Sequence, residues 1–396
     1  MLQWEMVQFL TLEGNFMKTD QAMQTMTPTN DPWEAYMDVE QFGELTLSNI
    51  EFTTTVMCNM RCAHCAVGYQ LQLSDPDALP VELMLKRLDE VPHLRTLSIT
   101  GGEPMMNKKS VRNYVIPLLR YAKERGVKTQ LNSNLTLPFD RYEDVIPYVD
   151  IMHISHNWGT EDEFAETGFA NMKRKPPVER RKRLLEQMIE NSRRLADQGV
   201  MVSAETMLNK RTFPYLEQIH DQIVNEMGCV RHEVHPMYPV DFASNLETLS
   251  LEEIRDGIIR LLEHRNKDVW MLFGTLPFYA CSSNPKDLEL LERLYQEENV
   301  SLRNDPDGRS RLNVNIFTGD IIVTDFGDEP ALGNIQTTTL LEAYENWLNT
   351  RTAKSLNCHC PAVRCLGPNI LVKNTYYEDV DFTKRKAKIT SSGKGL

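Results

Sequence analysis

Between residues 50 and 266 the chain alternates short apolar, β-branched segments with longer segments whose apolar residues recur every three or four positions. Short apolar or alternating runs predict strands, and the period near 3.6 predicts helices. A strand–helix alternation of this length requires a parallel sheet with right-handed crossovers. We therefore expect an α/β fold that is either curled into a partial (β/α)6 TIM-like barrel or laid out as a flatter doubly wound sheet. The expected strands are 50–57, 94–100, 127–132, 150–155, 200–208 and 230–238.

Helices are expected between these strands and after the last one. The first expected helix carries an apolar stripe, and the second ends at a glycine that suits a C-cap, Gly126. In either arrangement of the sheet, the chemistry belongs at the carboxyl ends of the strands. The expected helices are 81–91, 110–126, 177–199, 213–228 and 250–265.

Outside residues 50–266 the alternation of strand and helix patterns is absent. Residues 1–49 predict an N-terminal extension packed on the partial barrel of residues 50–266, and residues 267–382 predict a smaller C-terminal domain. That domain contains a β-hairpin over 311–327, turned at 318–320, and a helix that follows it. The tail 383–396 is basic and predicts a solvated, disordered end.

The composition limits the class of partner and the compartment. Hydrophobic residues make up 41% of the 396 residues and the formal charge is −13, which argues against bulk binding to nucleic acid or to an anionic membrane, although local basic patches remain open. The start of the sequence does not resemble a signal peptide, and no apolar run is long enough to span a bilayer. We therefore expect a cytoplasmic protein, in which clustered cysteines indicate metal or redox chemistry.

Three cysteines follow the first strand directly: Cys58, Cys62 and Cys65, in the pattern C-x3-C-x2-C. A structural zinc site needs four protein ligands. His64 is a poor fourth ligand because it is adjacent to Cys65. Three thiolates instead suit a [4Fe-4S] cluster that leaves one iron open.

A glycine pair and a carboxylate, Gly101, Gly102 and Glu103, end the second strand. Paired glycines allow close approach to the backbone, and a carboxylate accepts charge-assisted hydrogen bonds from an ammonium group. Taken alone, the segment is equally well explained as a strand-to-loop turn. Its position one strand–helix unit after the cysteines makes it more specific.

Together these motifs resemble the radical SAM superfamily, over about residues 50–265. The resemblance implies that the three cysteines hold a [4Fe-4S] cluster whose open iron chelates S-adenosylmethionine, and that the Gly-Gly-Glu segment contacts the methionine ammonium. His64 stands where that family usually has an aromatic residue. Further cofactor contacts are expected at strand ends, where ordinary loop-forming residues are the alternative, and at a charge inside the fifth strand, which is costly unless paired. These residues are Asn132, Ser133, Ser155 and Glu205.

A second set of cysteines, Cys358, Cys360 and Cys365, lies near the C-terminus, with Cys281 as the candidate fourth thiol and Cys229 expected in the core. Four thiolates suit zinc or a complete [4Fe-4S] cluster, and a redox dithiol is a third reading. The hairpin and helix before them resemble SPASM and twitch extensions, which carry auxiliary iron-sulfur clusters. That pattern usually has a cysteine where this chain has Thr324, which leaves room for one auxiliary cluster, with zinc as the second choice.

The combination of both cysteine patterns resembles the radical SAM/CxCxxxxC-motif (YfkAB-like) proteins. The resemblance implies reductive cleavage of S-adenosylmethionine to a 5′-deoxyadenosyl radical and hydrogen abstraction from a substrate C–H bond, with a flavodoxin- or ferredoxin-type electron donor. It also points to a small molecule or a protein side chain as substrate, in the pathway that modifies a lysine of elongation factor P. The sequence identifies no catalytic residue.

Two other classes of function remain open at this stage. One is an iron-sulfur or zinc protein that senses or scaffolds without turnover, which would not need the Gly-Gly-Glu segment. The other is an RNA-modifying radical SAM enzyme, against which the acidic charge balance argues.

Overall fold

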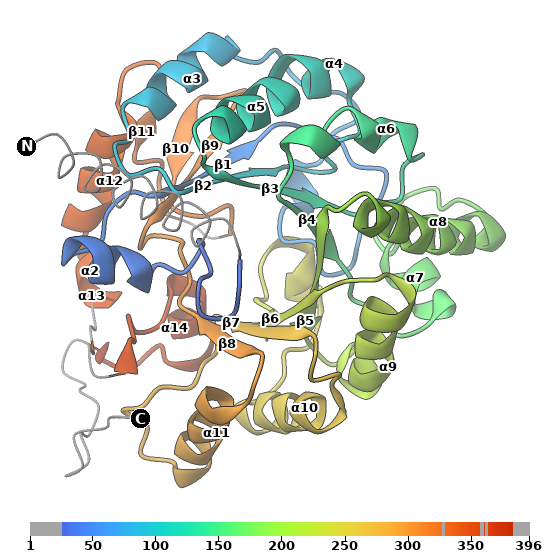
Figure 1. Cartoon of the computed structure of the whole chain (residues 1–396), viewed down its shortest axis with the longest axis vertical. Helices are drawn as coiled ribbons and strands as arrows, with labels where there is room; N and C mark the ends of the chain where they lie inside the picture. Colours follow the sequence, from blue (N-terminus) through green and yellow to red (C-terminus); the bar gives the residue numbers. More distant parts are fainter. Residues whose placement is uncertain (1–25, 327–328, 357–359, 361–362, 383–396) are drawn as a thin grey trace, which may run out of the picture.

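The computed structural model describes residues 26–326, 329–356, 360 and 363–382. These residues form one open, mostly parallel sheet of eleven strands in the order β11-β10-β9-β1-β2-β3-β4-β5-β6-β7-β8. Figure 1 shows the strands curving in an arc with helices on the outside. The strands are β1 Asn49–Thr53, β2 Thr96–Thr100, β3 Lys128–Ser133, β4 Ile151–Ser155, β5 Met201–Leu208, β6 Arg231–Pro236, β7 Trp270–Gly274, β8 Val300–Arg303, β9 Arg311–Asn315, β10 Asp320–Ile322 and β11 Gly333–Asn334.

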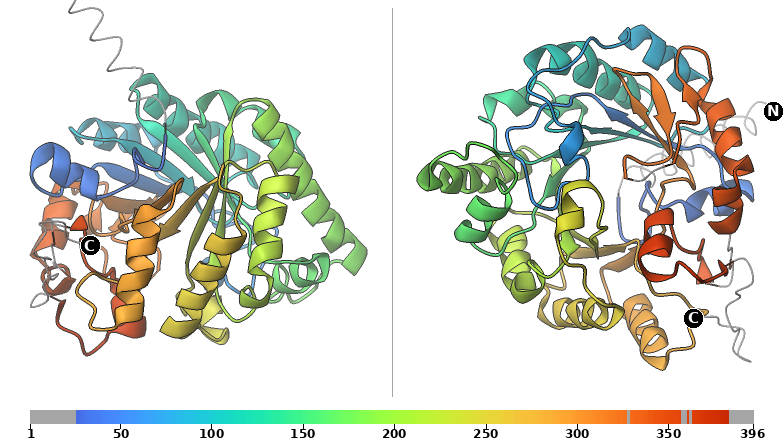
Figure 2. Two further views of the ribbon diagram at one scale, coloured as in Figure 1. Left: turned by 60° about the horizontal axis from the view of Figure 1, so that its bottom comes forward. Right: turned by 180° about the vertical axis from the view of Figure 1, so that it is seen from behind.

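Helices connect the parallel strands and cover the convex face of the sheet (Figure 2). Two of the expected helices are interrupted by π-helical turns, at Val111–Val115 and Gln222–Glu226. The α-helices are α2 Tyr36–Phe42, α3 Val81–Asp89, α4 Lys108–Ser110, α5 Ile116–Glu124, α6 Asp140–Glu143, α7 Glu161–Thr167, α8 Val178–Asp197, α9 Leu216–Asp221, α10 Leu251–His264, α11 Pro285–Gln296, α12 Leu340–Asn349, α13 Arg351–Leu356 and α14 Ile370–Tyr376.

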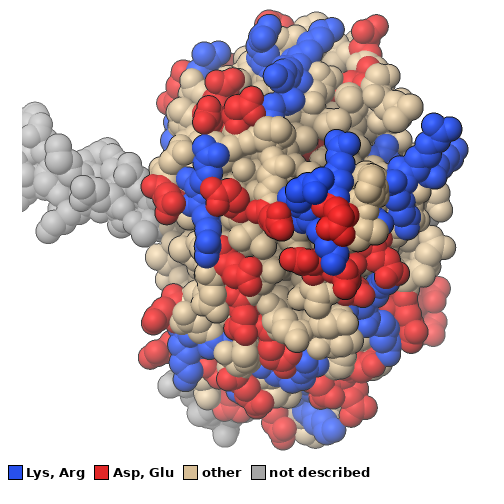
Figure 3. Space-filling model, turned by 90° about the vertical axis from the view of Figure 1, so that its right-hand side faces the viewer, with Lys and Arg blue, Asp and Glu red and all other residues tan. Residues whose placement is uncertain are grey.

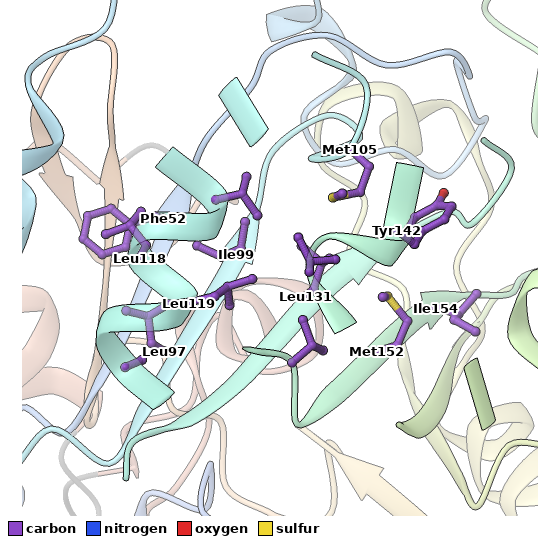
Figure 4. Packing of buried hydrophobic residues seen from close by; sticks show 14 of the residues in the cluster. Phe52, Leu97, Ile99, Met105, Leu118, Leu119, Leu131, Tyr142, Met152 and Ile154 are labelled. Atoms are coloured by element: carbon purple, nitrogen blue, oxygen red, sulfur yellow. The ribbon is translucent and has the colours of Figure 1, made fainter. Parts of the chain in front are cut away.

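The main core lies between the sheet and this helical layer. Alternate residues of β1 and β2, such as Phe52 and Ile99, point outward and are fully buried against Leu118 and Leu119 of α5 (Figure 4). The outward-facing alternate residues of the strands therefore pack against the apolar stripe of the helix. The same alternation directs the remaining strand residues to the concave side.

An N-terminal segment fills part of the concave side (Figures 1 and 2). Trp33 is 1% exposed, and its indole Nε1 donates to Ser98 Oγ of β2 at 3.1 Å. Arg303 at the end of β8 binds Asp31 at 2.6 Å. The expected extension thus packs inside the arc, at least over its described residues; residues 1–25 lie outside them.

The α/β prediction is confirmed, and the sheet is larger than the six strands expected. Two further parallel strands, β7 and β8, extend the edge at β6, and β9 pairs in parallel with β1, so that Glu51 aligns with Asn313. The predicted hairpin is β9–β10, turned at Gly319, whose φ is +78°. The region after residue 266 therefore supplies strands to both edges of one sheet. The domain boundaries expected at 50, 267 and 383 stay predictions, and the tail 383–396 lies outside the described residues.

Within the described part of the chain, no helix is both long and apolar enough to cross a bilayer.

Candidate functional site

The first cysteine loop follows β1, and its three cysteine residues are partly buried. The backbone N–H of Met60 points at Cys58 Sγ at 3.4 Å, and the side-chain amide of Asn134 lies 3.8 Å from the same sulfur. Donors that converge on a sulfur stabilise a thiolate. These two donors therefore offset part of the cost of placing a negative charge on Cys58.

Hydrogen bonds fix the cysteine loop at two places. Before the cysteines, Asp75 accepts hydrogen bonds from the Thr55 hydroxyl at 2.7 Å and the Val56 N–H at 2.8 Å. Between the cysteines, Arg61 N donates to Gly168 O at 3.0 Å, just beyond α7. A loop fixed in this way holds its thiols at set positions before any metal binds.

The three thiols stand in a setting that disfavours their charged forms. Burial raises the pKa of Cys58 to about 12, with negative charge on Glu103 and Cys65 adding to the effect. Burial followed by the charges of Cys65 and Cys58 raises the pKa of Cys62 well above its usual value, and burial raises that of Cys65. Converging thiols with raised pKa values suit a strongly cationic partner, so this donor set fits an iron-sulfur cluster.

The glycine pair brings the second strand end against this loop. Gly102 N donates to Thr55 O at 2.9 Å and Glu103 N donates to Met57 O at 2.7 Å. A Cβ at Gly102 would lie 2.2 Å from Met57 O, and one at Gly101 would lie 2.4 Å from Thr55 O. The glycines therefore permit close contact between two backbone segments. They also line a small cavity with Leu71 and Asp325.

Glu103 faces inward. Its carboxylate accepts hydrogen bonds from Ser133 Oγ at 2.9 Å, Asn134 N at 2.8 Å and Met105 N at 3.2 Å, and the residue is fully buried. Burial raises the pKa of Glu103 to about 7, although these three hydrogen bonds lower it in part. Glu103 and Ser133 thus join the second and third strand ends to each other, and the carboxylate is occupied by protein donors.

The concave side of the sheet is lined by polar side chains, which we call the polar lumen. They come from alternate positions of the strands, on the face opposite to the core. The polar lumen consists of Glu51, Ser98, Gln130, Asn132, His153, Ser155, Ser203, Glu205, Arg231, Glu233, His235, Arg303 and Asn313.

Glu205 lies between two histidines in the polar lumen. His153 Nε2 is 3.0 Å from one carboxylate oxygen and His235 Nε2 is 3.1 Å from the other. Burial would raise the pKa of Glu205, but the two histidines outweigh it and hold the pKa well below its usual value. Burial would lower the pKa of His235, but Glu205 raises it to about 9. Glu205 is therefore anionic and His235 cationic at neutral pH.

Asn132 belongs to a second polar group around Glu51. Asn132 Nδ2 donates to Glu51 at 3.3 Å, and Asn313 Nδ2 donates to both Glu51 at 3.4 Å and Asp325 at 3.3 Å. Burial raises the pKa of Asp325 to about 7, and the nearby Glu51 and Asp307 charges add to it. Asp325 links this group to the cavity beside Gly101 and Gly102.

The residues at the end of β4 differ in exposure and in their contacts. Ser155 is partly exposed and aligns with Glu205 of β5. His156 is fully buried, and its Nε2 bonds Gln222 Oε1 at 2.7 Å. Asn157 accepts from Met207 N at 2.7 Å and its amide lies 3.2 Å from His64 Nε2. His64 is thus engaged away from the cysteines.

The C-terminal cysteines meet in a second place. Cys281, Cys360 and Cys365 line one small cavity with Tyr279 and Phe382. The backbones of Cys360 and Cys365 exchange two hydrogen bonds of 2.9 and 3.2 Å, and Gly367 N points at Cys365 Sγ at 3.3 Å. Burial raises the pKa of Cys365 to about 11, with negative charge on Cys360 and Cys281 adding to it. The fourth predicted ligand, Cys358, lies outside the described residues.

Three of the four predicted thiols are therefore brought together, and Cys229 is kept apart in the core, 3% exposed. Among the described residues, no three Cys, His, Asp or Glu side chains are arranged to hold a single metal ion. A [4Fe-4S] cluster binds each cysteine through a different iron, so its ligands stand farther apart than those of one ion.

Comparison with known proteins identifies the family. The model of the radical SAM superfamily matches residues 52–221 and the model of the YfkB-like domain matches residues 237–387. Protein YfkA of Bacillus subtilis (strain 168) is 67% identical over 366 residues, covering 92% of this chain and 98% of that protein. The chain belongs to the radical SAM superfamily. It is a radical SAM enzyme with a YfkB-like C-terminal region, as the sequence motifs predicted.

Solved structures share the fold. Streptococcus suis SuiB bound to S-adenosylmethionine is 14% identical, with a TM-score of 0.55 over 85% of this chain and 76% of that chain. The structure of anSMEcpe with bound AdoMet and a Cp18Cys peptide is also 14% identical, with a TM-score of 0.51 over 84% of this chain and 91% of that chain. Membership of the superfamily implies a [4Fe-4S] cluster and S-adenosylmethionine as cofactors.

Several lumen residues were missed by the sequence reasoning. Glu51 and His153 stand singly between buried apolar neighbours, and Glu233 stands between buried His232 and Val234. A charged residue at every second position of an otherwise apolar strand is the signal that would have found them, because such a residue must face a polar interior. Asp325 reaches the site from a loop that carries no such pattern, and Arg303 ends a strand of four residues, in which the alternation is too short to be a clear signal.

Proposed function

We propose that this enzyme binds a [4Fe-4S] cluster through Cys58, Cys62 and Cys65 and abstracts hydrogen from a substrate C–H bond in the polar lumen. The observation that carries the proposal is the placement of three converging thiols at the end of β1, against Gly101 and Gly102 and beside the lumen. When bound, the cluster and S-adenosylmethionine supply a 5′-deoxyadenosyl radical by reductive cleavage.

The chain's own residues orient the reactants and exclude water. The backbone of Gly101 and Gly102 borders the cavity where the methionine end of S-adenosylmethionine would lie. Ser133 and Glu103 hold that strand end in place from within. Asn132, Ser155 and Glu205 face the lumen and would contact the ribose, the sulfonium or the substrate. Glu205 with His235 offers an acceptor and a donor of protons at 3.1 Å.

We further propose an auxiliary [4Fe-4S] cluster on Cys281, Cys358, Cys360 and Cys365, with zinc as the alternative. The three described thiols share a cavity enclosed by Tyr279, Val363 and Phe382. An auxiliary cluster there would take an electron from the substrate and make the net reaction an oxidation. The electron for the first cluster would come from a flavodoxin- or ferredoxin-type donor.

The substrate class we propose is an amine-bearing side chain or its small precursor, in the pathway that modifies a lysine of elongation factor P. Three carboxylates, Glu51 and Glu205 of the polar lumen and Asp325 beside it, support a cationic substrate, whose charge would offset the burial that raises the pKa of Glu51 and Asp325. Two proteins of this fold have been described with peptides: SuiB with its precursor peptide SuiA, and anSMEcpe with a Cp18Cys peptide.

Anaerobic reconstitution tests the cofactor assignment. Wild type and the C58A/C62A/C65A variant are loaded with iron and sulfide, and iron is counted on each. About eight irons falling to about four would establish two clusters, whereas about four falling to none would assign the C-terminal thiols to zinc or to thiol chemistry. If dithionite-reduced wild type forms no 5′-deoxyadenosine from S-adenosylmethionine, the enzyme assignment fails and a sensor or scaffold role takes its place.

The substrate proposal has its own test. Reduced enzyme is incubated with S-adenosylmethionine and lysine, lysyl peptides or elongation factor P, and products are analysed by mass spectrometry. We expect faster 5′-deoxyadenosine formation and a mass change in one amine-bearing substrate, but in no matched substrate with an acetylated amine. Equal stimulation by both would remove the amine from the proposal.

A further inference from the structure

One short segment carries a charge opposite to that of the whole chain. Residues 173–183, here called the basic segment, contain seven Lys or Arg residues and a single acidic residue, Glu179, whereas the complete chain has a formal charge of −13. The segment covers the loop after α7 and the first turns of α8. A local basic excess of this size on an acidic protein creates a field that orients charged partners.

The basic segment begins next to the first cysteine loop. Asn171, two residues before it, donates its backbone N–H to Arg61 O at 3.1 Å and its side-chain amide to Cys62 O at 3.2 Å. Ala63 N donates to Thr167 O at 2.9 Å, at the end of α7. The polypeptide that holds the cluster ligands is therefore hydrogen-bonded to the polypeptide that leads into the basic residues.

The basic side chains are free to meet a partner. Lys173, Arg174 and Lys175 are exposed, as are Arg180 and Arg183, and none of the five forms an ion pair with a described residue. Lys182 is different, because it binds Asp162 at 2.7 Å. Figure 3, which views the side of the molecule that carries α8, shows acidic and basic side chains mixed over most of this face and a group of Lys and Arg at its upper right.

The segment is also fixed in place and partly apolar. Two prolines, Pro176 and Pro177, lead into α8, and Arg181 donates to the carbonyl oxygens of Pro176, at 3.0 Å, and Ala165. Val178, the first residue of α8, is 46% exposed among the basic side chains. The positive end of the helix dipole points the same way as the side-chain charges. A rigid basic surface around an exposed apolar residue is typical of a site that binds a protein, whereas an ordinary solvent-exposed loop needs neither the rigidity nor the apolar residue.

We propose that the basic segment is the docking surface for the acidic one-electron carrier protein that reduces the first cluster. This inference rests on the proposed function, since it assumes a cluster on Cys58, Cys62 and Cys65. One electron leaves the reduced carrier and enters the oxidised cluster, and no atom is transferred. Electron transfer rates fall steeply with distance, so a carrier must dock beside the cysteine loop. The basic segment is a charged surface that adjoins this loop.

Charge complementarity selects an acidic carrier. The net negative charge of the chain repels an acidic protein, so local attraction at residues 173–183 both raises the encounter rate and favours one orientation of the carrier. An acidic macromolecular substrate or an RNA would be attracted by the same charges, and the experiment separates these occupants.

The test compares two charge-reversal variants with the same change of net charge. K173E/R174E/K175E alters the basic segment, and K86E/R120E/R351E alters three exposed basic residues of α3, α5 and α13 that form no ion pair with a described residue. Both are assayed for 5′-deoxyadenosine formation with an acidic flavodoxin reduced enzymatically, and separately with dithionite. We expect the segment variant to lose about tenfold or more of the flavodoxin-driven rate at low ionic strength, with a smaller loss at high salt, and to keep its dithionite-driven rate.

Binding is measured without turnover as well. Carbodiimide joins amines to carboxylates in direct contact, so we expect flavodoxin to cross-link to Lys173 or Lys175 of apo and reconstituted wild type. Absence of these cross-links, or an unchanged flavodoxin-driven rate in the segment variant, would overturn the docking surface. Equal loss of the flavodoxin-driven and dithionite-driven rates in the segment variant would also overturn it. So would a segment variant that no longer retains RNA at low salt but keeps its flavodoxin-driven rate. Failure of every variant and wild type with dithionite would instead refute the proposed function.

Discussion

Glu205 of β5 and His235 of β6 form a buried ion pair, with 3.1 Å between the carboxylate and Nε2. Their side chains are 18% and 16% exposed, so water screens the pair only weakly. The pair shifts the two pKa values in opposite directions, which makes Glu205 a fixed negative charge facing the lumen over a wide range of pH.

The first prediction concerns the pH dependence of this pair. His235 has a folded pKa of about 9 against an ordinary 6.5, so the stability it contributes is complete below about pH 6.5 and is lost as the pH rises through about 9. Glu205 contributes above about pH 4.5 and loses its contribution on acidification, because its folded pKa is lowered. E205Q should therefore reduce the melting temperature most near pH 6, by an amount equivalent to about 3 kcal/mol at most, and less near pH 9.5.

The matched control is E217Q, which removes the carboxylate partner of Arg260 at 2.5 Å. An arginine does not titrate in this range, so the effect of E217Q should be small and constant with pH. An E205Q deficit that is equally constant from about pH 6 to about pH 9.5 would contradict the coupling between Glu205 and His235.

The sequence predicted what local patterns control. The helix that begins after Ser250 was expected from residue 250, and the structure gives it a capping box in which Ser250 and Glu253 bond each other's backbone N–H groups. The cysteine loop was expected at the end of a strand, because β-branched residues stop at Cys58. These features depend on neighbours within a few residues of each other.

Long-range pairings could not be predicted from such patterns. Asp31 meets Arg303 across 272 positions, and Asn313 joins the Glu51 group through the pairing of β9 with β1. Gly102 also has a contact that the sequence did not predict, because a Cβ there would lie 2.2 Å from the Met57 carbonyl oxygen, whereas the expected approach of a ligand to this glycine stays a prediction. Only the three-dimensional arrangement decides which surface approaches a glycine.

The second prediction follows from that close contact. G102A places a methyl group 2.2 Å from the backbone oxygen of Met57, so the segment that leads into Cys58 must move. We expect reconstituted G102A to lose about four irons per chain and to form no 5′-deoxyadenosine. In G126A the new methyl has no neighbour within 4 Å, although φ is +72°, so this control should lose about 1 kcal/mol of stability and keep its iron. Equal iron contents in the two variants would show that the contact does not position the cysteine loop.

The third prediction concerns the anchor of the N-terminal segment. Arg303 binds Asp31 at 2.6 Å and Glu233 at 2.9 Å, and all three side chains are at most 10% exposed. R303M leaves two buried carboxylates without their shared cation, which should cost about 3–5 kcal/mol. Limited proteolysis should then cut within residues 26–48, whereas the same region of wild type should be protected.

Arg293 provides the comparison for Arg303. It also binds two carboxylates, at 3.3 and 3.5 Å, but its side chain is 35% exposed. R293M should therefore cost less than about 1 kcal/mol and leave the N-terminal segment protected. If R303M were no less stable than R293M, the lumen ion pairs would not hold the segment in place.

The fourth prediction separates the cysteines of the second site from the core cysteine. Cys281 shares a cavity with Cys360 and Cys365, whereas Cys229 lies 3.9 Å from the Ser192 hydroxyl beneath α8. C281A should reduce the iron content from about eight to about four per chain, because the auxiliary cluster loses a ligand while the first cluster stays loaded. Formation of 5′-deoxyadenosine should persist, since Cys58, Cys62 and Cys65 are unchanged. C229A should keep all its iron, because a buried thiol in an apolar setting contributes packing alone. A C281A enzyme with a full iron content would assign the fourth thiol of the cluster elsewhere.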